Sequence, residues 1–325
     1  MRAYPGLLVL ALFVPACTVG DTGNPGGSPD AGAPAVDADL NGSAEIKGSI
    51  GENSAWGGMV TLTENATIEP GVLVTVAPGT VFQGAQGTTL TVHGTLQVEG
   101  TAAAPVTMNP IEGDGGWGGI LVEAGGSVSL SHATGTKVAT LVSCKAGAAQ
   151  CAMDSLEFTD LGIAMTAASV ATISKSSFRN LANGGISVSG NGDLTVTDTY
   201  IWTSTHDLVV ASGGRLIIDH SEIGGAQQSY EHCDLHISAA SELRITNSNI
   251  VSAVYGMMIG GTTNAVIQYN NFMENDPGQD VDPVGANTGV DLRFNYWDQG
   301  APTIGPDYDT SSPAATAYAE AGPRP

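Results

Sequence analysis

Histidine, cysteine and aspartate side chains gather in two short stretches of this chain. The first stretch is Thr205-His206-Asp207, and the second is His232-Cys233-Asp234, with His236 two residues further on. Imidazole nitrogens, thiolates and carboxylate oxygens are ligands for zinc and related divalent metals. We expect the two stretches to stack with Asp207 beside Asp234. If residues 232, 234 and 236 point outward by strand alternation, either His232 or His236 joins Asp207 and Asp234 around one ion. No recognised metal-ligand spacing occurs, so a solvated polar face is the alternative interpretation.

Two aromatic residues, Tyr200 and Trp202, lie close to the first stretch in the sequence. Aromatic faces stack on neutral sugar rings, although the same residues also cap exposed turns. The candidate ligand or metal face therefore consists of Trp202, His206, Asp207, His232, Cys233, Asp234 and His236.

An acidic loop near the C-terminal end is a second candidate site. It contains Glu274, Asp276, Asp280 and Asp282. Hard oxygen ligands on a loop suit Ca²⁺, which an extracellular compartment supplies. The spacing matches no EF-hand or glycine-aspartate repeat, so a solvated acidic loop without a cofactor is the alternative.

Composition indicates which elements position these side chains. The chain has 325 residues, of which 42% are hydrophobic and 13% charged. Few Lys and Arg residues and many Thr, Ser, Gly, Val and Ile favour strands and turns over helices, which predicts an all-β protein. The net charge of −22 argues against nucleic acid as a partner, because such binders concentrate positive charge where they contact phosphates.

An internal repeat organises the central part of the chain. Five 17-residue blocks align without gaps, and they begin at Gly162, Gly185, Asp207, Asp234 and Gly256. Apolar residues recur at block positions 2, 4, 10, 12 and 17, which is the alternation of short strands separated by turns. A unit this short cannot bury its own apolar face, so neighbouring units must stack.

The stacking predicts a parallel β-helix solenoid with about 11 turns over residues 45–298. Position 17 forms an inward column of Phe and Ile residues. Position 9 brings Arg215 between Asp193 and Glu242, which predicts an ion ladder on the surface. Residues 299–325 are a Pro-rich tail.

The N-terminal segment indicates export. Residues 1–16 have a charged start and an apolar run, the layout of a signal peptide. Val14-Pro15-Ala16-Cys17 resembles a lipobox, which implies a lipid on Cys17, and Thr18 at the next position favours the outer membrane by resemblance to Gram-negative lipoproteins. Residues 17–44 lack large apolar residues and are expected to form a flexible tether.

Three cysteines remain when Cys17 carries the lipid. Cys144 and Cys151 flank a short polar loop and are expected to form a disulfide in an oxidising compartment. Cys233 is then left as a small buried residue or as a reactive thiol or ligand.

Several segments are similar to bacterial surface proteins with right-handed β-helix repeats. They are IEPGVLVTVAPGTVF at 68–82, GTLQVEGTAAAP at 94–105, Trp117-Gly118-Gly119-Ile120, and the closing Phe294-Asn295-Tyr296-Trp297. The resemblance covers roughly residues 56–306 and implies a right-handed helix of the pectate-lyase-like superfold. That superfold includes lyases, hydrolases and epimerases as well as non-catalytic adhesins, so the fold alone does not assign a function.

The repeat does not contain the combinations of catalytic residues that enzymes of that superfold use. No two of Arg179, Arg215, Arg244 and Arg293 share a repeat column, and no paired aspartates with Gly-His-Gly occur. The sequence therefore predicts a lipid-anchored, non-catalytic β-helix of the outer membrane, surface-exposed or periplasmic, with a structural, adhesive or ligand-binding role. Its expected partners are the membrane and a polysaccharide or an envelope protein. The alternatives are a polysaccharide-active enzyme or carbohydrate-binding module, and a periplasmic metal-binding protein.

Overall fold

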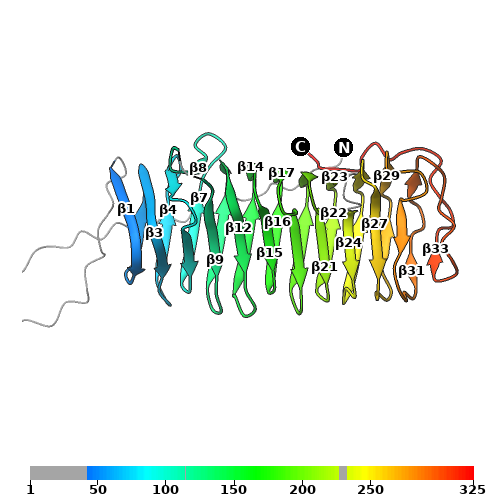
Figure 1. The fold of residues 1–325 in the computed structure, drawn as a ribbon, viewed down its shortest axis with the longest axis horizontal. Coiled ribbons are helices and arrows are strands. Elements are labelled where there is room, and N and C mark those ends of the chain that lie inside the picture. Colours follow the sequence, from blue (N-terminus) through cyan, green and yellow to red (C-terminus); the bar gives the residue numbers. More distant parts are fainter. Residues whose placement is uncertain (1–41, 114, 227–232) are drawn as a thin grey trace, which may run out of the picture. The chain divides into compact units, whose positions relative to one another are not determined.

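The regular structure of the protein is a right-handed parallel β-helix (Figure 1). The computed structural model describes residues 42–113, 115–226 and 233–325. Within them the chain coils through about ten turns, where about 11 were predicted, and no α-helix occurs in these segments. The predicted all-β solenoid is therefore confirmed. The described residues include no helix long and apolar enough to cross a membrane.

A complete turn contributes one strand to each of three parallel ladders, and the turns at the two ends are incomplete. Ladder 1 contains β5 (Val81–Gly84), β8 (Val106–Pro110), β11 (Ala133–Thr136), β14 (Glu157–Thr159), β17 (Ser177–Leu181), β20 (Tyr200–Ser204), β23 (Glu222–Ala226), β26 (Asn249–Val251), β29 (Asn271–Met273) and β32 (Tyr296–Trp297). Ladder 2 contains β6 (Thr89–Val92), β9 (Trp117–Val122), β12 (Val138–Cys144), β15 (Ile163–Ala167), β18 (Ile186–Ser189), β21 (Val209–Ser212), β24 (Cys233–Ser238), β27 (Tyr255–Gly260) and β30 (Val281–Pro283).

Ladder 3 closes each turn and forms a separate 12-stranded sheet. It contains β2 (Ser54–Trp56), β4 (Leu73–Val76), β7 (Thr95–Glu99), β10 (Ser127–Ser131), β13 (Gln150–Asp154), β16 (Val170–Ser174), β19 (Asp193–Thr197), β22 (Arg215–Asp219), β25 (Glu242–Thr246), β28 (Val266–Gln268), β31 (Val290–Asp291) and β33 (Tyr308–Asp309). At the first turns, β1 (Ser43–Ile50) pairs with β3 (Met59–Ile68), whose two halves begin ladders 1 and 2. Among the described residues the first strand begins at Ser43, and β33 lies within the Pro-rich tail.

The core is built from inward columns of apolar side chains. Phe178, Ile201, Ile223, Ile250 and Phe272 pair from rung to rung on ladder 1 and are fully buried. This is the predicted position-17 column, and it is confirmed. At its C-terminal end the ring of Phe272 stacks on Trp297, with 4.4 Å between ring centroids. Burial of such columns is the main favourable term in the stability of a solenoid.

A buried polar column fixes the corner between ladder 3 and ladder 1. Its members are Ser176, Thr199, Ser221, Ser248, Asn270 and Asn295. From Ser176 onward, the side-chain oxygen on each turn accepts a hydrogen bond from the corresponding backbone N–H one turn earlier, as in Ser248 N to Asn270 Oδ1 at 2.9 Å. The residue just before each member has positive φ, for example Asp198 at 49° and His220 at 44°. The column therefore satisfies buried backbone donors at a tight, left-handed corner.

Two further predictions about specific residues are confirmed. Arg215 on β22 bonds Asp193 at 2.7 Å and Glu242 at 2.9 Å on the turns before and after it, which forms the expected ion ladder. Cys144 at the end of β12 and Cys151 on β13 form a disulfide.

Candidate functional site

The expected stacking of Asp207 on Asp234 is wrong. On ladder 2, Val209 pairs with Leu235, so β21 and β24 are shifted by one residue from the gap-free alignment. The shift arises because the turns from ladder 2 to ladder 3 differ in length, with two residues between β21 and β22 and three between β24 and β25. Asp207 consequently lies opposite Cys233, whose N–H donates to Asp207 Oδ1 at 2.9 Å.

Asp234 points inward, whereas strand alternation predicted that it would point outward. Cys233, Asp234 and Leu235 are consecutive residues at the start of β24, and all three are fully buried. Asp234 Oδ1 accepts the N–H of Ala226 at 3.3 Å, while Oδ2 has no hydrogen-bond partner among the described residues. Burial raises the pKa of this carboxyl well above its ordinary value. Asp234 is therefore not available to a metal on the outer face.

Three of the predicted face residues do come together. Asp207, Cys233 and His236 offer ligand atoms that all lie within 4.8 Å of one another. His236 Nδ1 lies 3.1 Å from Asp207 Oδ2. Burial and the neighbouring Asp207 carboxylate raise the pKa of the Cys233 thiol. Among the described residues, this is the one group of three or more His, Cys, Asp or Glu side chains with such spacing.

The other members of the predicted face are arranged differently. His206 is exposed, and its Nδ1 lies 3.0 Å from Thr205 Oγ1. Trp202 is half-buried on β20 and packs over Gly224, where an added Cβ would meet the indole ring. His232 lies outside the described residues. Of the residues predicted to form one face, only Asp207, Cys233 and His236 are therefore shown to form a cluster, at the corner between ladders 1 and 2.

The carboxylates of the acidic loop do not form a group of three or more ligand atoms within 4.8 Å of one another. Asp280 is buried and accepts a hydrogen bond from Asn275 Nδ2 at 2.9 Å, and burial raises its pKa. Glu274 Oε2 accepts the hydroxyl of Ser252 at 2.9 Å. Asp282 lies on β30, and Asp276 belongs to the turn before it. The loop acids are therefore distributed between the interior and the outer face.

A groove along the outer face of ladder 1 was not anticipated from the sequence. Three adjoining hollows of about 500, 380 and 270 Å³ share Glu157. They extend over the outward residues of neighbouring rungs, including Thr134 on β11, Ser177 on β17 and Tyr200 on β20. We call this continuous depression the ladder 1 groove.

The centre of the groove carries both hydrogen-bond donors and acceptors. Arg179 extends over the ring of Tyr200, with 5.5 Å from Cζ to the ring centroid, and its Nε donates to Ser177 Oγ at 3.1 Å. Glu157 and Lys175 are exposed, and their side chains form no hydrogen bond or ion pair with other described residues. An aromatic platform beside open polar groups is suited to a hydroxyl-rich ligand.

The C-terminal tail lies along the same face of ladder 1 beyond the groove. Tyr318 exchanges two backbone hydrogen bonds with the side chain of Asn271 on β29, at 2.8 and 3.0 Å. Further along, the N–H of Gly322 donates to the carbonyl of Asn247 at 2.9 Å. Figure 1 shows the tail as the red segment that runs back over the earlier turns.

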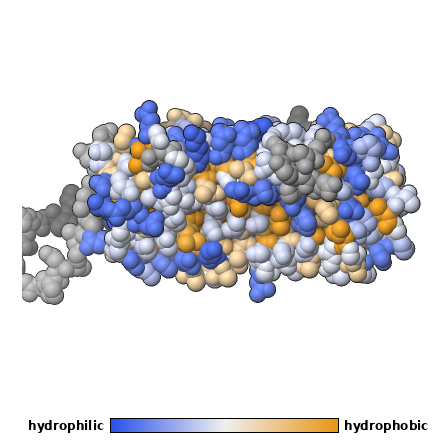
Figure 2. All heavy atoms as spheres, viewed as in Figure 1, coloured by the Kyte–Doolittle hydropathy of each residue, from blue (hydrophilic) through white to orange (hydrophobic). Residues whose placement is uncertain are grey.

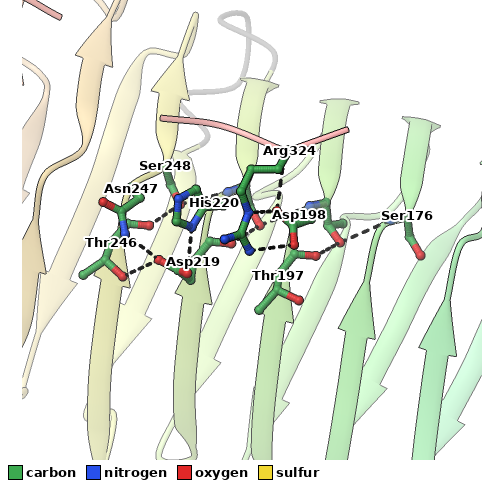
Figure 3. Close-up of polar contacts among 11 residues, drawn as sticks. Ser176, Thr197, Asp198, Asp219, His220, Thr246, Asn247, Ser248 and Arg324 are labelled. Carbon is green, nitrogen blue, oxygen red and sulfur yellow. Dashed lines mark hydrogen bonds and ion pairs between the residues drawn. The ribbon is translucent and has the colours of Figure 1, made fainter. Parts of the chain in front are cut away.

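Arg324 anchors the end of the described tail. Its guanidinium forms a bidentate pair with Asp198, at 2.7 and 2.9 Å (Figure 3). This contact holds the pKa of Asp198 below its ordinary value. Pro323, Arg324 and Pro325 also line one of the three hollows, so the tail forms part of the groove wall.

The signal that could have revealed the groove lies beside the inward column. Block positions 16 and 18 flank position 17 and must face outward, and they are Ser177 and Arg179 in one block and Tyr200 and Trp202 around Ile201 in the next. Glu157 precedes the aligned blocks and carries no such signal. On the face seen in Figure 2, apolar residues occupy the middle and hydrophilic residues gather at the upper edge.

These features define the protein as a right-handed parallel β-helix with an outward groove and a His/Cys/Asp cluster. The sequence model of the family described as right handed beta helix region matches residues 161–296. Among solved structures, the A-module of a mannuronan C-5 epimerase from Azotobacter vinelandii is similar, with 11% identity, coverage of 81% of this chain and 91% of that chain, and a TM-score of 0.37. No protein of curated function shows significant sequence similarity to the chain.

Proposed function

We propose that the protein is a non-catalytic β-helix of the cell envelope that binds an extended, neutral polysaccharide in the ladder 1 groove. The observation that carries this proposal is the run of three hollows that share Glu157 and are lined by Tyr200, Arg179 and Lys175. Rungs spaced about 4.8 Å apart repeat at close to the length of one sugar unit, so successive rungs contact successive sugars.

The charge of the groove and of the protein favours a neutral polysaccharide over a polyanionic one as the ligand. Glu157 lies in all three hollows and would face any carboxylated sugar, and the protein carries a net charge of −22. Lys175 and Glu157 together supply donors and acceptors for hydroxyl groups. The tail supports an extended ligand, because it lies as an extended segment over the same ladder.

The lining acids support binding without turnover. Hydrolysis of a glycosidic bond uses two carboxyl groups, one of which carries a proton. Among the described groove residues the acids are Glu157 and Asp198, and Asp198 is held ionised by Arg324. We also propose that a lipid on Cys17 attaches the protein to the outer membrane and that residues 18–44 form the tether. Cys17 and the residues up to 41 lie outside the described part of the chain.

A combined binding and turnover screen tests this function. The mature chain is incubated with neutral and uronic polysaccharides, with and without Ca²⁺, while retention, reducing ends and unsaturated products are followed. We expect retention by a neutral polysaccharide, weaker retention by uronic ones and no products. Product formation that disappears in Glu157→Gln would overturn the non-catalytic assignment and establish an enzyme in the same groove.

The lipid anchor has a separate test. Metabolic labelling with a fatty acid should label the native chain and leave Cys17→Ser unlabelled. A native chain that stays unlabelled and is released into the medium would contradict the anchor without affecting the groove.

A further inference from the structure

The Asp207, Cys233 and His236 cluster is not part of the ladder 1 groove. The three residues belong to two successive turns of the helix. Asp207 lies in the corner segment between β20 and β21, and the other two lie on β24. None of them lines the three hollows of the groove. The cluster therefore requires an explanation of its own.

We propose that Asp207, Cys233 and His236 bind a thiophilic divalent metal ion of the zinc type. Their ligand atoms lie within 4.8 Å of one another, and the His236–Asp207 pair is already at 3.1 Å. Tetrahedral zinc with bonds of about 2.0–2.3 Å places its ligand atoms roughly 3.3–3.8 Å apart, so small side-chain movements suffice. One thiolate, one imidazole and one carboxylate are a donor set that favours zinc over Ca²⁺ or Mg²⁺.

The backbone around the cluster fixes one of the ligands. Asp207 uses Oδ1 to accept the N–H of Cys233 at 2.9 Å, which leaves Oδ2 directed at His236. A ligating carboxylate is commonly held in this way by a second hydrogen bond. The side chains of His236 and Asp207 are 37% and 21% exposed, so an ion reaches the site from the outer face while the thiol stays buried.

A metal at this position would join two turns of the solenoid. Asp207 comes from the turn of β21 and the other two ligands from the turn of β24, so the ion would cross-link neighbouring rungs at a corner. Three protein ligands leave a fourth coordination position for water or another group. Binding to the folded state alone raises stability by mass action, so the proposal predicts a thermal shift with the metal.

Metal titration of the mature chain tests the site. The titrated variant carries Cys17→Ser, so that Cys233 is its free thiol. It is freed of metal with a chelator before Zn²⁺ or Co²⁺ is added alone. We expect one ion per chain, a rise in Tm with Zn²⁺, and a thiolate-to-metal charge-transfer band with Co²⁺. Cys233→Ala should abolish the band, and His236→Gln should weaken Zn²⁺ binding by at least about tenfold.

A histidine elsewhere on the helix provides the matched control. His132 pairs with Ser131 at 3.0 Å and belongs to another corner, so His132→Gln should leave Zn²⁺ affinity unchanged. The proposal is overturned if the chain binds no Zn²⁺. It is also overturned if His236→Gln, which substitutes a partly exposed side chain, has no more effect than His132→Gln. A Co²⁺ complex without a thiolate band would remove Cys233 from the ligand set and contradict the site as proposed.

Discussion

The two corners on either side of ladder 1 are built on different principles. At the corner that enters ladder 1, from Ser176 on, each turn supplies one left-handed residue followed by one buried Ser, Thr or Asn. The side-chain oxygen of that buried residue accepts a hydrogen bond from a backbone N–H of the preceding turn. At the corner that leaves ladder 1, the connecting segments vary in length, and Asp207 from one of them meets Cys233 and His236 of β24.

The difference shows where the fold tolerates variation. The entering corner satisfies buried backbone donors through side chains, so a change there leaves a buried polar group without a partner. The connecting segments of the leaving corner vary in length, and Asp207 and His236 there are partly exposed, so insertions are accommodated on this side. We therefore expect the stability of the protein to depend mainly on the entering corner. Ligand binding should depend on the leaving corner and on the outward face of ladder 1 between the two corners.

The largest effect is expected from Asn270→Ala in the buried column. The Asn270 side chain accepts from Ser248 N and donates to the carbonyl of Ile245, both at 2.9 Å. Removing it leaves both backbone groups buried without a partner, which should lower the free energy of unfolding by about 3 kcal/mol. Urea denaturation measures the change, with Thr172→Ala on the exposed side of β16 as a control expected to stay within about 0.5 kcal/mol. Equal effects of the two substitutions would contradict the difference between the corners.

A pH-dependent effect is expected next, from Asp234→Asn at the leaving corner. The folded-state pKa of Asp234 is raised above its ordinary value near 3.8, so the folded state holds a proton that the unfolded state has lost. Stability should consequently fall as pH rises above about 4, until the folded carboxyl itself ionises. Asp234→Asn cannot ionise and should gain stability relative to the native chain on going from pH 4 to pH 8.

Denaturation curves at the two pH values measure that relative change. A constant difference between the native chain and Asp234→Asn at both pH values would show that Asp234 does not titrate with a raised pKa.

A smaller effect is expected from releasing the tail with Arg324→Ala. The Arg324 side chain is 54% exposed, so loss of its pair with Asp198 should cost less than about 1 kcal/mol. The Asp198 pKa is lowered in the folded state, so this contribution is present at neutral pH and is lost as pH falls below about 4. Hydrogen exchange at the Gly322 amide, which is bonded to Asn247, should become faster at pH 7; unchanged protection would show that Arg324 does not hold the tail.

The smallest effect is expected from Arg215→Ala on ladder 3. Its ion ladder with Asp193 and Glu242 is at the surface, so we expect a loss of about 0.5 kcal/mol that shrinks in high salt. Denaturation at two salt concentrations provides the measurement. A loss as large as that of Asn270→Ala would mean that surface ladders hold the rungs as strongly as the buried column does.

The parts of the fold that were predictable are those next to the entering corner. Residues 170–174 of ladder 3 and Phe178 of ladder 1 keep a fixed spacing, because one left-handed residue and one buried polar residue separate the two strands on each turn. A gap-free alignment therefore gave the correct partners for Arg215 and for the position-17 column. It failed on ladder 2, where the turns that connect to ladder 3 range from two residues between β21 and β22 to five between β27 and β28.

The candidate sites were predictable only in part, for the same reason. The grouping of Asp207, Cys233 and His236 in one region follows from their positions in the repeat, but the one-residue shift and the consecutive buried residues at β24 decide which atoms meet. The groove depends on Glu157, which precedes the aligned blocks, and on a tail whose Pro-rich composition indicates an extended chain without indicating where it lies.

Binding of a neutral polysaccharide to the native chain and to Tyr200→Ala tests the central claim most directly. Calorimetric titration should show binding to the native chain that weakens by about tenfold in Tyr200→Ala, because loss of an aromatic contact of about 1.4 kcal/mol corresponds to that factor. Arg179→Ala should weaken binding as well, whereas Arg244→Ala, an exposed arginine on ladder 3, should leave it unchanged. Equal affinity for all four proteins, or no binding to the native chain, would contradict a ligand groove on ladder 1.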